Sequence, residues 1–203
     1  MTARISYMTT GTAVNINVDA VYPGPVTKHV HSRNQNVSGS GKTETINLYG
    51  AEEIAVECQF TPANYHSLYG WWSWARQGKH FSFALNSNNS AKTTLDSSAT
   101  AGDTVIPLTA TTGIDVGDVM LLRNATNDDE FEIITATSIK PSTSIKISSA
   151  LIFSYPTSSL CRHKDYWPEA LSVDESFMPS RTGIPSTNSD AYYRNTFSFR
   201  ENL

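Results

Sequence analysis

Two histidines spaced two residues apart are the first candidates for chemistry in this sequence. His29 and His31 lie in a weakly alternating segment, Val26 to Arg33, that predicts a strand, and residues two apart in a strand share one face. Two imidazoles on one face can bind a metal ion, but no third ligand follows nearby. The sequence favours solvated strand histidines, and no metal site is predicted.

A glycine-rich stretch, Ser38 to Lys42 (SGSGK), has the composition of a phosphate-binding loop. Such a loop needs a strand before it, a helix after it and the first glycine of the pattern GxxxxGK[ST]. Here that glycine is missing, and residues Thr43 to Leu48 alternate as a strand. We interpret the stretch as a loop between two strands and predict no cofactor.

Acidic residues offer little for catalysis. The pairs Glu52-Glu53 and Asp129-Glu130 are adjacent, so in a strand their side chains point to opposite faces, unlike the paired carboxylates of a glycoside hydrolase. No G-x-S-x-G or H-E-x-x-H pattern occurs. The aspartates of the middle of the chain do not have calcium-loop spacing and are interpreted as turn caps. They are Asp115, Asp118, Asp128 and Asp129. We predict no catalytic residues, with a hydrolase as the remaining enzyme alternative.

Composition limits the function classes further. The chain has 203 residues, 17% of them charged, and a formal net charge of -4. It lacks a Lys/Arg block, so sequence-specific nucleic-acid binding is not expected. Neither a signal peptide nor an apolar run of membrane-spanning length is found, so we expect no membrane span and synthesis in a cytoplasm. Cys58 and Cys161 are interpreted as free buried thiols.

The strongest local pattern runs from Thr61 to Leu85 and predicts helix, turn and strand. Thr61 and Pro62 are typical of a helix start and Gly78 of a helix end, which places the helix at 62–77. Its apolar stripe and the following Phe-x-Phe strand predict a core, with Trp71 and Trp74 on the flank of the stripe. The predicted core residues are Tyr65, Leu68, Tyr69, Trp72, Phe81 and Phe83.

Strand patterns dominate the rest of the chain. Alternation from Val14 to Val18 and from Ile54 to Phe60 predicts half-buried strands. Residues 89–151 carry short strand patterns separated by turn residues and lack Trp, Tyr and Cys, unlike the flanking sequence. We therefore predict a mainly β protein: a discontinuous β-sandwich, 1–88 plus 152–203, with one packed helix, and an inserted small β-barrel or sandwich at 89–151.

Three segments resemble the distal tail proteins of long-tailed bacteriophages (siphoviruses). They are the loop and strand from Ser38 to Ile46, the strand Ile54 to Phe60 leading into a helix with Leu68, Trp72 and Trp74, and the segment Gly78 to Phe83. The insertion, from Ala101 to Val119, is similar to small β modules of phage tail and fibre proteins. The resemblance covers about half of the chain.

This resemblance implies a fold and a function. The fold would be a tail-tube-like β-sandwich with one helix, and the protein a virion component of the tail tip, or baseplate. Copies would form a ring, a hexamer, that joins the tail tube protein to the hub and fibre proteins and leaves a channel for DNA. Candidate subunit contacts are Trp71, Trp74, Lys42 and Arg181. A carbohydrate-binding module or glycan-adhesion protein, using Tyr166 and Trp167, is the alternative.

Overall fold

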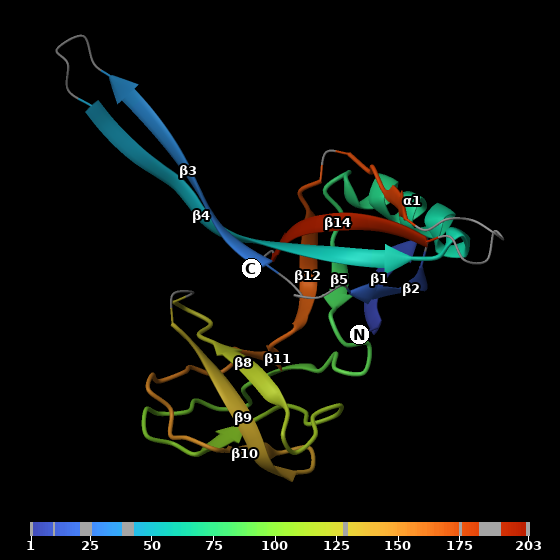
Figure 1. Ribbon diagram of the computed structural model, residues 1–203. Coiled ribbons are helices and arrows are strands. Elements are labelled where there is room, and N and C mark those ends of the chain that lie inside the picture. Colours follow the sequence, from blue (N-terminus) through green and yellow to red (C-terminus); the bar gives the residue numbers. More distant parts are fainter. Residues whose placement is uncertain are drawn as a thin grey trace. The chain divides into compact units, whose positions relative to one another are not determined.

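The computed structural model describes residues 2–9, 11–20, 26–37, 43–127, 130–174, 176–182 and 192–201, and at 26–37, 43–52 and 182 the backbone alone. The described chain is mainly β, with one helix (Figure 1). It divides into two compact units. The first comprises Met1–Phe83 and Trp167–Leu203, and the second Ala84–Tyr166.

Eight strands of the first unit form one curled sheet, in the order β13-β14-β12-β5-β1-β2-β4-β3. The strands are β1 (Thr2–Thr9), β2 (Thr12–Ala20), β3 (Val26–Val37), β4 (Thr43–Phe60), β5 (Phe81–Ala84), β12 (Tyr166–Ser172), β13 (Ser180–Thr182) and β14 (Tyr192–Glu201). β14 also pairs with β4, so the strands from β14 round to β4 form a closed circuit. The sheet therefore encloses a core.

β4 is the longest strand, at 18 residues, and its two halves have different neighbours. Its last part, Glu53 to Phe60, pairs with β14. Its first part pairs with β3, from Val37 opposite Thr43 to Val26 opposite Ala55, as a long hairpin (Figure 1). The predicted loop between these strands, Ser38 to Lys42, lies outside the described residues.

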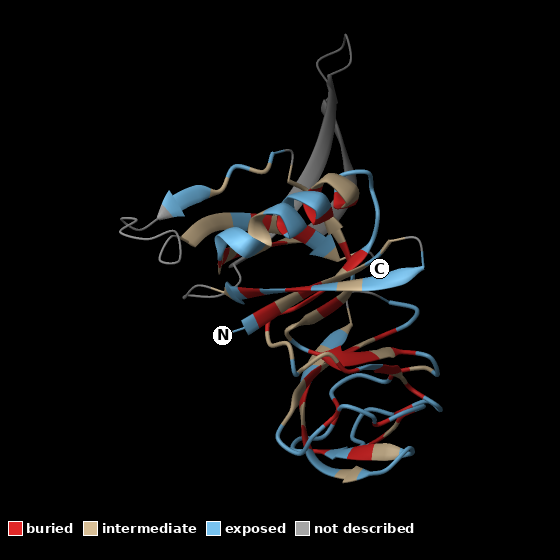
Figure 2. Ribbon diagram, turned by 90° about the vertical axis from the view of Figure 1, so that its right-hand side faces the viewer, coloured by how far each residue is buried: buried red, intermediate tan, exposed pale blue. Residues whose placement is uncertain are grey.

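The predicted alternation is confirmed in the strands that enclose the core. Ile16 and Val18 of β2 are buried, and so are Phe197 and Phe199 of β14. In β4 the inward residues are Ile54, Val56, Cys58 and Phe60. Burying such side chains contributes about 25 cal/mol per Å² of apolar surface, so this interior (red in Figure 2) provides most of the unit's stability.

The helix α1 (Pro62–Ala75) begins at the predicted residue and ends two residues early. Thr61 takes the N-cap position with extended backbone, but its side chain makes no capping hydrogen bond. Gly78 has φ +74°, a left-handed conformation that glycine adopts without steric cost. The turn at Arg76–Gly78 leads the chain directly into β5.

The buried face of α1 is rotated relative to the prediction. The buried residues are Leu68, Trp71, Trp72 and Ala75, at helical spacing. Trp71 is 1% exposed and its ring packs edge-on against Phe81 at 4.9 Å and Phe197 at 5.2 Å. Tyr69 is 51% exposed, so its assignment to the core was wrong. The larger, less polar indole takes the core position, and the tyrosine hydroxyl stays in water.

The second unit is a closed six-stranded barrel in the order β6-β11-β8-β9-β10-β7. Its strands are β6 (Lys92–Thr94), β7 (Val105–Pro107), β8 (Val119–Arg123), β9 (Phe131–Lys140), β10 (Ser144–Ile147) and β11 (Leu160–His163). A bridge between Leu95 and Leu108 joins β6 to β7 and closes it. Its core includes Met120, Leu122 and Ile134.

The barrel extends beyond the predicted insertion of 89–151. β11 lies between β6 and β8, so the barrel cannot close without residues 160–163. Tyr155, which the sequence places in the outer domain, is 1% exposed within the barrel core. Four of the six barrel strands, β7 to β10, lie within the predicted insertion with its short strand patterns, whereas the short strands β6 and β11 were not predicted.

Candidate functional site

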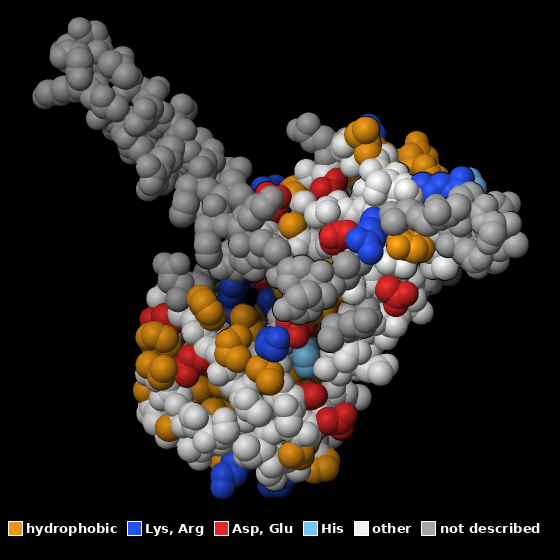
Figure 3. Space-filling view, viewed as in Figure 1, with side chains coloured by type: hydrophobic (Ala, Val, Ile, Leu, Met, Phe, Trp, Pro, Cys, Tyr) orange, Lys and Arg blue, Asp and Glu red, His pale blue; other side chains and the backbone are white. Residues whose placement is uncertain are grey.

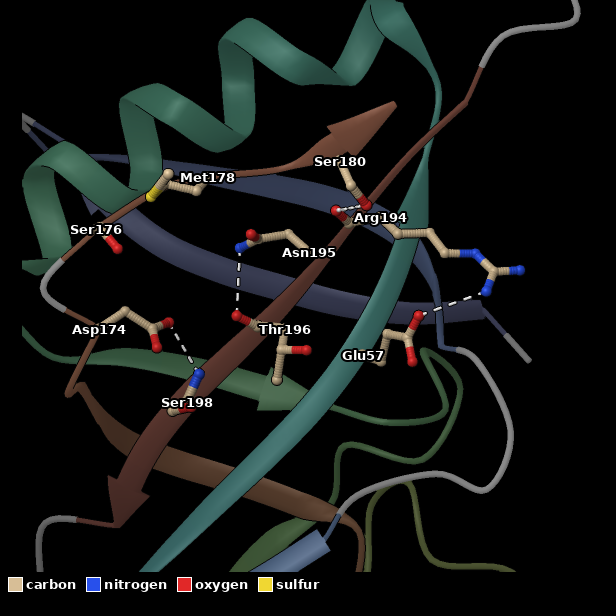
Figure 4. A pocket seen from close by; sticks show the side chains of 9 residues that line it. All are labelled: Glu57, Asp174, Ser176, Met178, Ser180, Arg194, Asn195, Thr196 and Ser198. Atoms are coloured by element: carbon tan, nitrogen blue, oxygen red, sulfur yellow. Dashed lines mark hydrogen bonds and ion pairs between the residues drawn. The ribbon is translucent and has the colours of Figure 1, made fainter. Parts of the chain in front are cut away.

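The main pocket of the first unit lies along the edge of β14 that faces β12 and β13. It is a polar cavity of about 460 Å³ (Figure 4). Its lining residues are Glu57, Asp174, Ser176, Met178, Ser180, Arg194, Asn195, Thr196 and Ser198. They come from β4, from β14, from the segment that joins β12 to β13, and from the first residue of β13.

A register mismatch creates this pocket. β12 and β13 pair with the same edge of β14, at Ser172 opposite Phe199 and at Ser180 opposite Arg194. From Phe199 to Arg194, β14 covers five residue steps. The opposite segment, from Ser172 to Ser180, covers eight, so it contains three residues more than regular pairing would need. The excess bulges away from β14. We call residues 173–174 and 176–179 the strap.

The strap is held to β14 by Asp174. One carboxylate oxygen, Oδ2, accepts the backbone N–H of Ser198 at 2.8 Å, and the Val173 N–H donates to the Ser198 carbonyl at 3.1 Å. The indole of Trp72 donates to the Asp174 carbonyl at 3.4 Å, which ties the strap to α1. The Asp174 N–H donates to the Ser172 hydroxyl at 3.4 Å. The carboxylate thus replaces a missing strand partner.

The fold raises the pKa of the Asp174 carboxyl group. Burial raises its pKa from 3.8 to about 6, because a half-buried carboxylate loses hydration. Within this net shift, the charge of Glu53 also acts to raise the pKa, whereas the hydrogen bonds from Ser198 act to lower it. Asp174 therefore changes its charge near pH 6.

Phe177 holds the middle of the strap on an aromatic cluster. Its ring lies between 5.6 and 6.4 Å from five other rings, measured between centroids. These rings belong to Phe60, Tyr65, Tyr69, Trp72 and Phe197. The cluster joins α1 to β4 and β14, so Phe177 links the strap to both layers of the unit.

The remaining polar groups of the pocket are only loosely paired. Arg194 lies 3.6 Å from Glu57, and both side chains are substantially exposed, so solvent weakens this ion pair. The backbone N–H and C=O groups of Ser198 point away from β4, toward the strap. Because these directions repeat every two residues along a strand, the N–H and C=O groups of Thr196 also point away from β4. Among the described residues, only the Asn195 amide reaches the Thr196 carbonyl, at 3.3 Å.

The pocket can bind polar groups through two carboxyl groups, Glu57 and Asp174, and several hydroxyl groups. Its lining contains serine hydroxyls without a histidine, lysine or cysteine beside them. Within the described ranges, no group of three His, Cys, Asp or Glu side chains could hold a metal ion. The side chains of His29 and His31 are not among those described.

The predicted core residues mostly meet in the helix–sheet layer. Leu68, Trp72, Phe81 and Phe83 are buried, and Tyr65 is half-buried at the edge of the aromatic cluster. Leu68, Phe81 and Phe83 are each 3% exposed or less. Only Tyr69 departs from its predicted burial, as described above.

The four predicted contact residues have different positions. Trp71 is in the core, so it cannot also form a subunit contact, and its assignment is corrected. Trp74 is half-buried, packs on Tyr7 at 5.1 Å and has the Lys79 ammonium 5.5 Å above its ring. Arg181 is exposed on β13. Lys42 lies outside the described residues.

The residues named for a glycan platform do not form one. Trp167 is 8% exposed and packs against Phe199 at 5.5 Å and Phe83 at 5.9 Å. Tyr166 is half-buried. A sugar ring would need an accessible aromatic face, which Trp167 does not offer.

Asp174 and Phe177 are the main residues that the sequence analysis did not single out for a role. Their local sequence, Ser172 to Ser180, has no periodicity that marks a strap. The one local signal is Phe177, an aromatic residue in an otherwise largely polar segment. The register mismatch depends on pairing with residues 194–199, which local patterns do not reveal.

A second exposed feature lies on the barrel. Phe131 and Ile133 of β9 are 46% and 55% exposed, and Leu121 of β8 pairs with Ile133 on the same outer face. Figure 3 shows hydrophobic side chains gathered on the surface of this unit. Neighbouring apolar residues on a sheet surface are typical of a contact with another molecule.

Comparisons with known proteins do not identify the chain. No model of a known protein family matches it, and the search of curated proteins found no match. In the described part of the chain, no helix has the length and apolar character needed to cross a bilayer.

Proposed function

We propose that this chain is a structural virion protein, the distal tail protein of a long-tailed phage. In this proposal the copies form a hexameric ring at the tail tip that joins the tail tube protein to the baseplate hub and fibre proteins. The ring leaves a channel for DNA, and the chain performs no catalysis. The curled sheet with α1 is then a tail-tube-like β-sandwich, and the barrel is a peripheral module.

The β3–β4 hairpin is the observation that carries this proposal. β3 pairs with β4 along its whole length, but β14 covers only the last eight residues of β4. An isolated two-stranded hairpin is marginally stable in water. A hairpin that extends past its own sheet therefore gains stability by pairing or packing against another subunit.

Three further features support the proposal. The order of β4, α1, Gly78 and β5 matches the segments that resemble distal tail proteins. Apolar side chains on β9 and the exposed Tyr69 of α1 offer surface for neighbouring molecules. The mild net negative charge of -4 suits a channel that conducts DNA without binding it.

Removing the hairpin tests the proposal. In the variant, residues 31–50 are replaced by Asn-Gly, a two-residue turn that joins the paired residues Val30 and Ala51. Native mass spectrometry and electron microscopy of the purified protein should show hexameric rings for the wild-type chain and monomers for the variant. Tryptophan fluorescence should show that the core around Trp71 stays folded. Rings that persist without the hairpin would contradict its role.

A further inference from the structure

The strap combines a titratable anchor with an aromatic anchor. The Asp174 carboxylate accepts the backbone N–H of Ser198 at 2.8 Å, in place of a neighbouring strand. Phe177, three residues later, packs on aromatic rings of α1, β4 and β14. The three excess residues mean that the strap cannot form a continuous ladder with β14. Its position therefore depends on these side-chain anchors.

Acidic groups dominate the surroundings of Asp174. β4 contributes Glu53, which acts on Asp174 electrostatically, and Glu57, which lines the same pocket. β14 contributes Arg194, which already faces Glu57 at 3.6 Å. α1 contributes no carboxylate, and its Arg76 lies over the Trp72 ring at 5.0 Å. An ionised Asp174 thus lacks a cationic partner of its own among the described residues.

Other charged groups lie close in the sequence. Arg200 follows Ser198 on β14 and is exposed, and its side chain is on the same parity as Ser198. Glu175, the residue after Asp174, lies outside the described residues, so it needs its own control variant. Arg200 does not replace the hydrogen bond that Ser198 gives to Asp174.

We propose that the strap is a pH-operated clasp: neutral Asp174 holds Phe177 on the aromatic cluster, and ionisation of Asp174 releases the strap from β14. Release restores water to the carboxylate and separates it from Glu53 and Glu57. It also uncovers the ring surfaces of Tyr65, Tyr69 and Trp72 that Phe177 covers in the closed strap, which then form a binding surface. The inference does not depend on ring formation.

The direction follows from the two protonation states. Burial raises the pKa of Asp174 in the closed strap to about 6, whereas a hydrated carboxyl has its ordinary value near 3.8. The closed form therefore binds the proton more tightly than the open form does. Between these two pH values the open population rises on the order of 100-fold, one factor of ten per unit of pKa difference.

Hydrogen exchange of the peptide 173–182, corrected for the intrinsic pH dependence, measures strap opening directly. The wild-type protein should show strong protection of this peptide at pH 5 and much faster exchange at pH 7.5. The Asp174→Asn variant, which is neutral at both pH values, should show equal protection at both. Equal protection of the wild-type peptide at both pH values, or an unchanged pH dependence in the variant, would overturn the proposal.

Three further variants separate the causes. Glu53→Gln should move the opening transition to lower pH, because it removes a negative charge that raises the pKa of Asp174. This variant tests the proposal even if Asp174→Asn does not fold, and an unmoved transition would refute it. Glu175→Gln should show the same opening transition as the wild-type protein, because the proposal assigns the transition to Asp174. A transition that disappears in Glu175→Gln would instead assign the pH dependence to Glu175 and contradict the proposal. Asp165→Asn, in the barrel, is the matched control and should change nothing at the strap.

Discussion

The carboxylate of Asp174 accepts the backbone N–H of Ser198 at 2.8 Å and completes the edge of β14 where the strand ladder is interrupted. This contact exists because β12 and β13 reach β14 with three residues too many between them. Local interruptions of a strand ladder, such as β-bulges, often lie beside functional sites. The pocket, the strap and the aromatic cluster all follow from the same mismatch.

Phe177→Ala should destabilise the first unit. The ring is half-buried and contacts five other rings, so we expect a loss of about 2 kcal/mol, below the cost for a fully buried phenylalanine. Urea denaturation followed by tryptophan fluorescence reports on this unit, because the four tryptophans all lie in it. Met178→Ala is the matched control, since Met178 is 79% exposed and should change stability by less than about 0.5 kcal/mol.

The thermal stability of the first unit should fall between pH 4 and pH 7 through Asp174. Its folded pKa, about 6, lies above the ordinary 3.8, so its contribution is complete below 3.8 and is lost as the pH rises through 6. Melting curves at several pH values should show this fall in the wild-type protein. In Asp174→Asn the fall should be smaller. A variant that melts in parallel with the wild-type protein at every pH would contradict this assignment.

Glu132 should be essential for the barrel. Its carboxylate accepts the N–H groups of Ile152 at 3.0 Å and Phe153 at 2.8 Å and the hydroxyl of Tyr155 at 3.1 Å. Glu132→Ala leaves these donors without their acceptor, so we expect a loss of about 3 kcal/mol. Glu130→Ala, which loses one bond to Asn124, should cost about 1 kcal/mol. Hydrogen exchange of barrel peptides measures both, and equal costs would contradict the special role of Glu132.

Two turns of the barrel use the same Gly-Asp device. Asp103 Oδ2 accepts the N–H of Thr100 at 2.7 Å, and Asp118 Oδ2 accepts the N–H of Asp115 at 2.8 Å. The residues before these aspartates are Gly102 and Gly117, with φ of +95° and +99°. Each turn thus combines a left-handed glycine with a carboxylate that caps the start of the turn.

Asp103→Ala and Asp118→Ala should each destabilise the barrel by about 1 kcal/mol, because each removes a charge-assisted hydrogen bond near the surface. The effects of the two variants should add in the double variant, since they remove separate bonds. Asp96→Ala is a control at an exposed aspartate outside these turns. Hydrogen exchange of the barrel core gives the stability of all four variants. A control as costly as the two turn variants would show that the turns have no special role.

The parts of the fold that local sequence predicts are those with strong periodicity. α1 begins at Pro62 and β5 follows Gly78, both as predicted, whereas β4 joins two predicted strand segments, Thr43 to Leu48 and Ile54 to Phe60, into one strand. β11 has four residues and no clear alternation, so the barrel boundary was placed too early. Its position depends on pairing with β6 and β8, which is a long-range property.

Side-chain placement was less predictable than strand and helix location. Trp71 rather than Tyr69 lies in the core, where its ring packs against Phe81 and Phe197, and α1 meets these two residues only in the folded protein. The strap depends on a register relation between residues 172–180 and 194–199. Helical periodicity locates the buried apolar stripe of a helix only approximately, so it does not decide which of several neighbouring aromatic residues is buried.

Subunit assembly is the central claim, and native mass spectrometry tests it most directly when Trp74→Ala and Trp71→Ala are compared with the wild-type chain. We predict hexamers for the wild-type chain. Trp74→Ala should keep its fold and lose hexamers, because the Trp74 ring is partly accessible. Trp71→Ala should lose about 3 kcal/mol or more of folding stability. A wild-type chain that stays monomeric at high concentration and also with its tail tube protein would contradict the account.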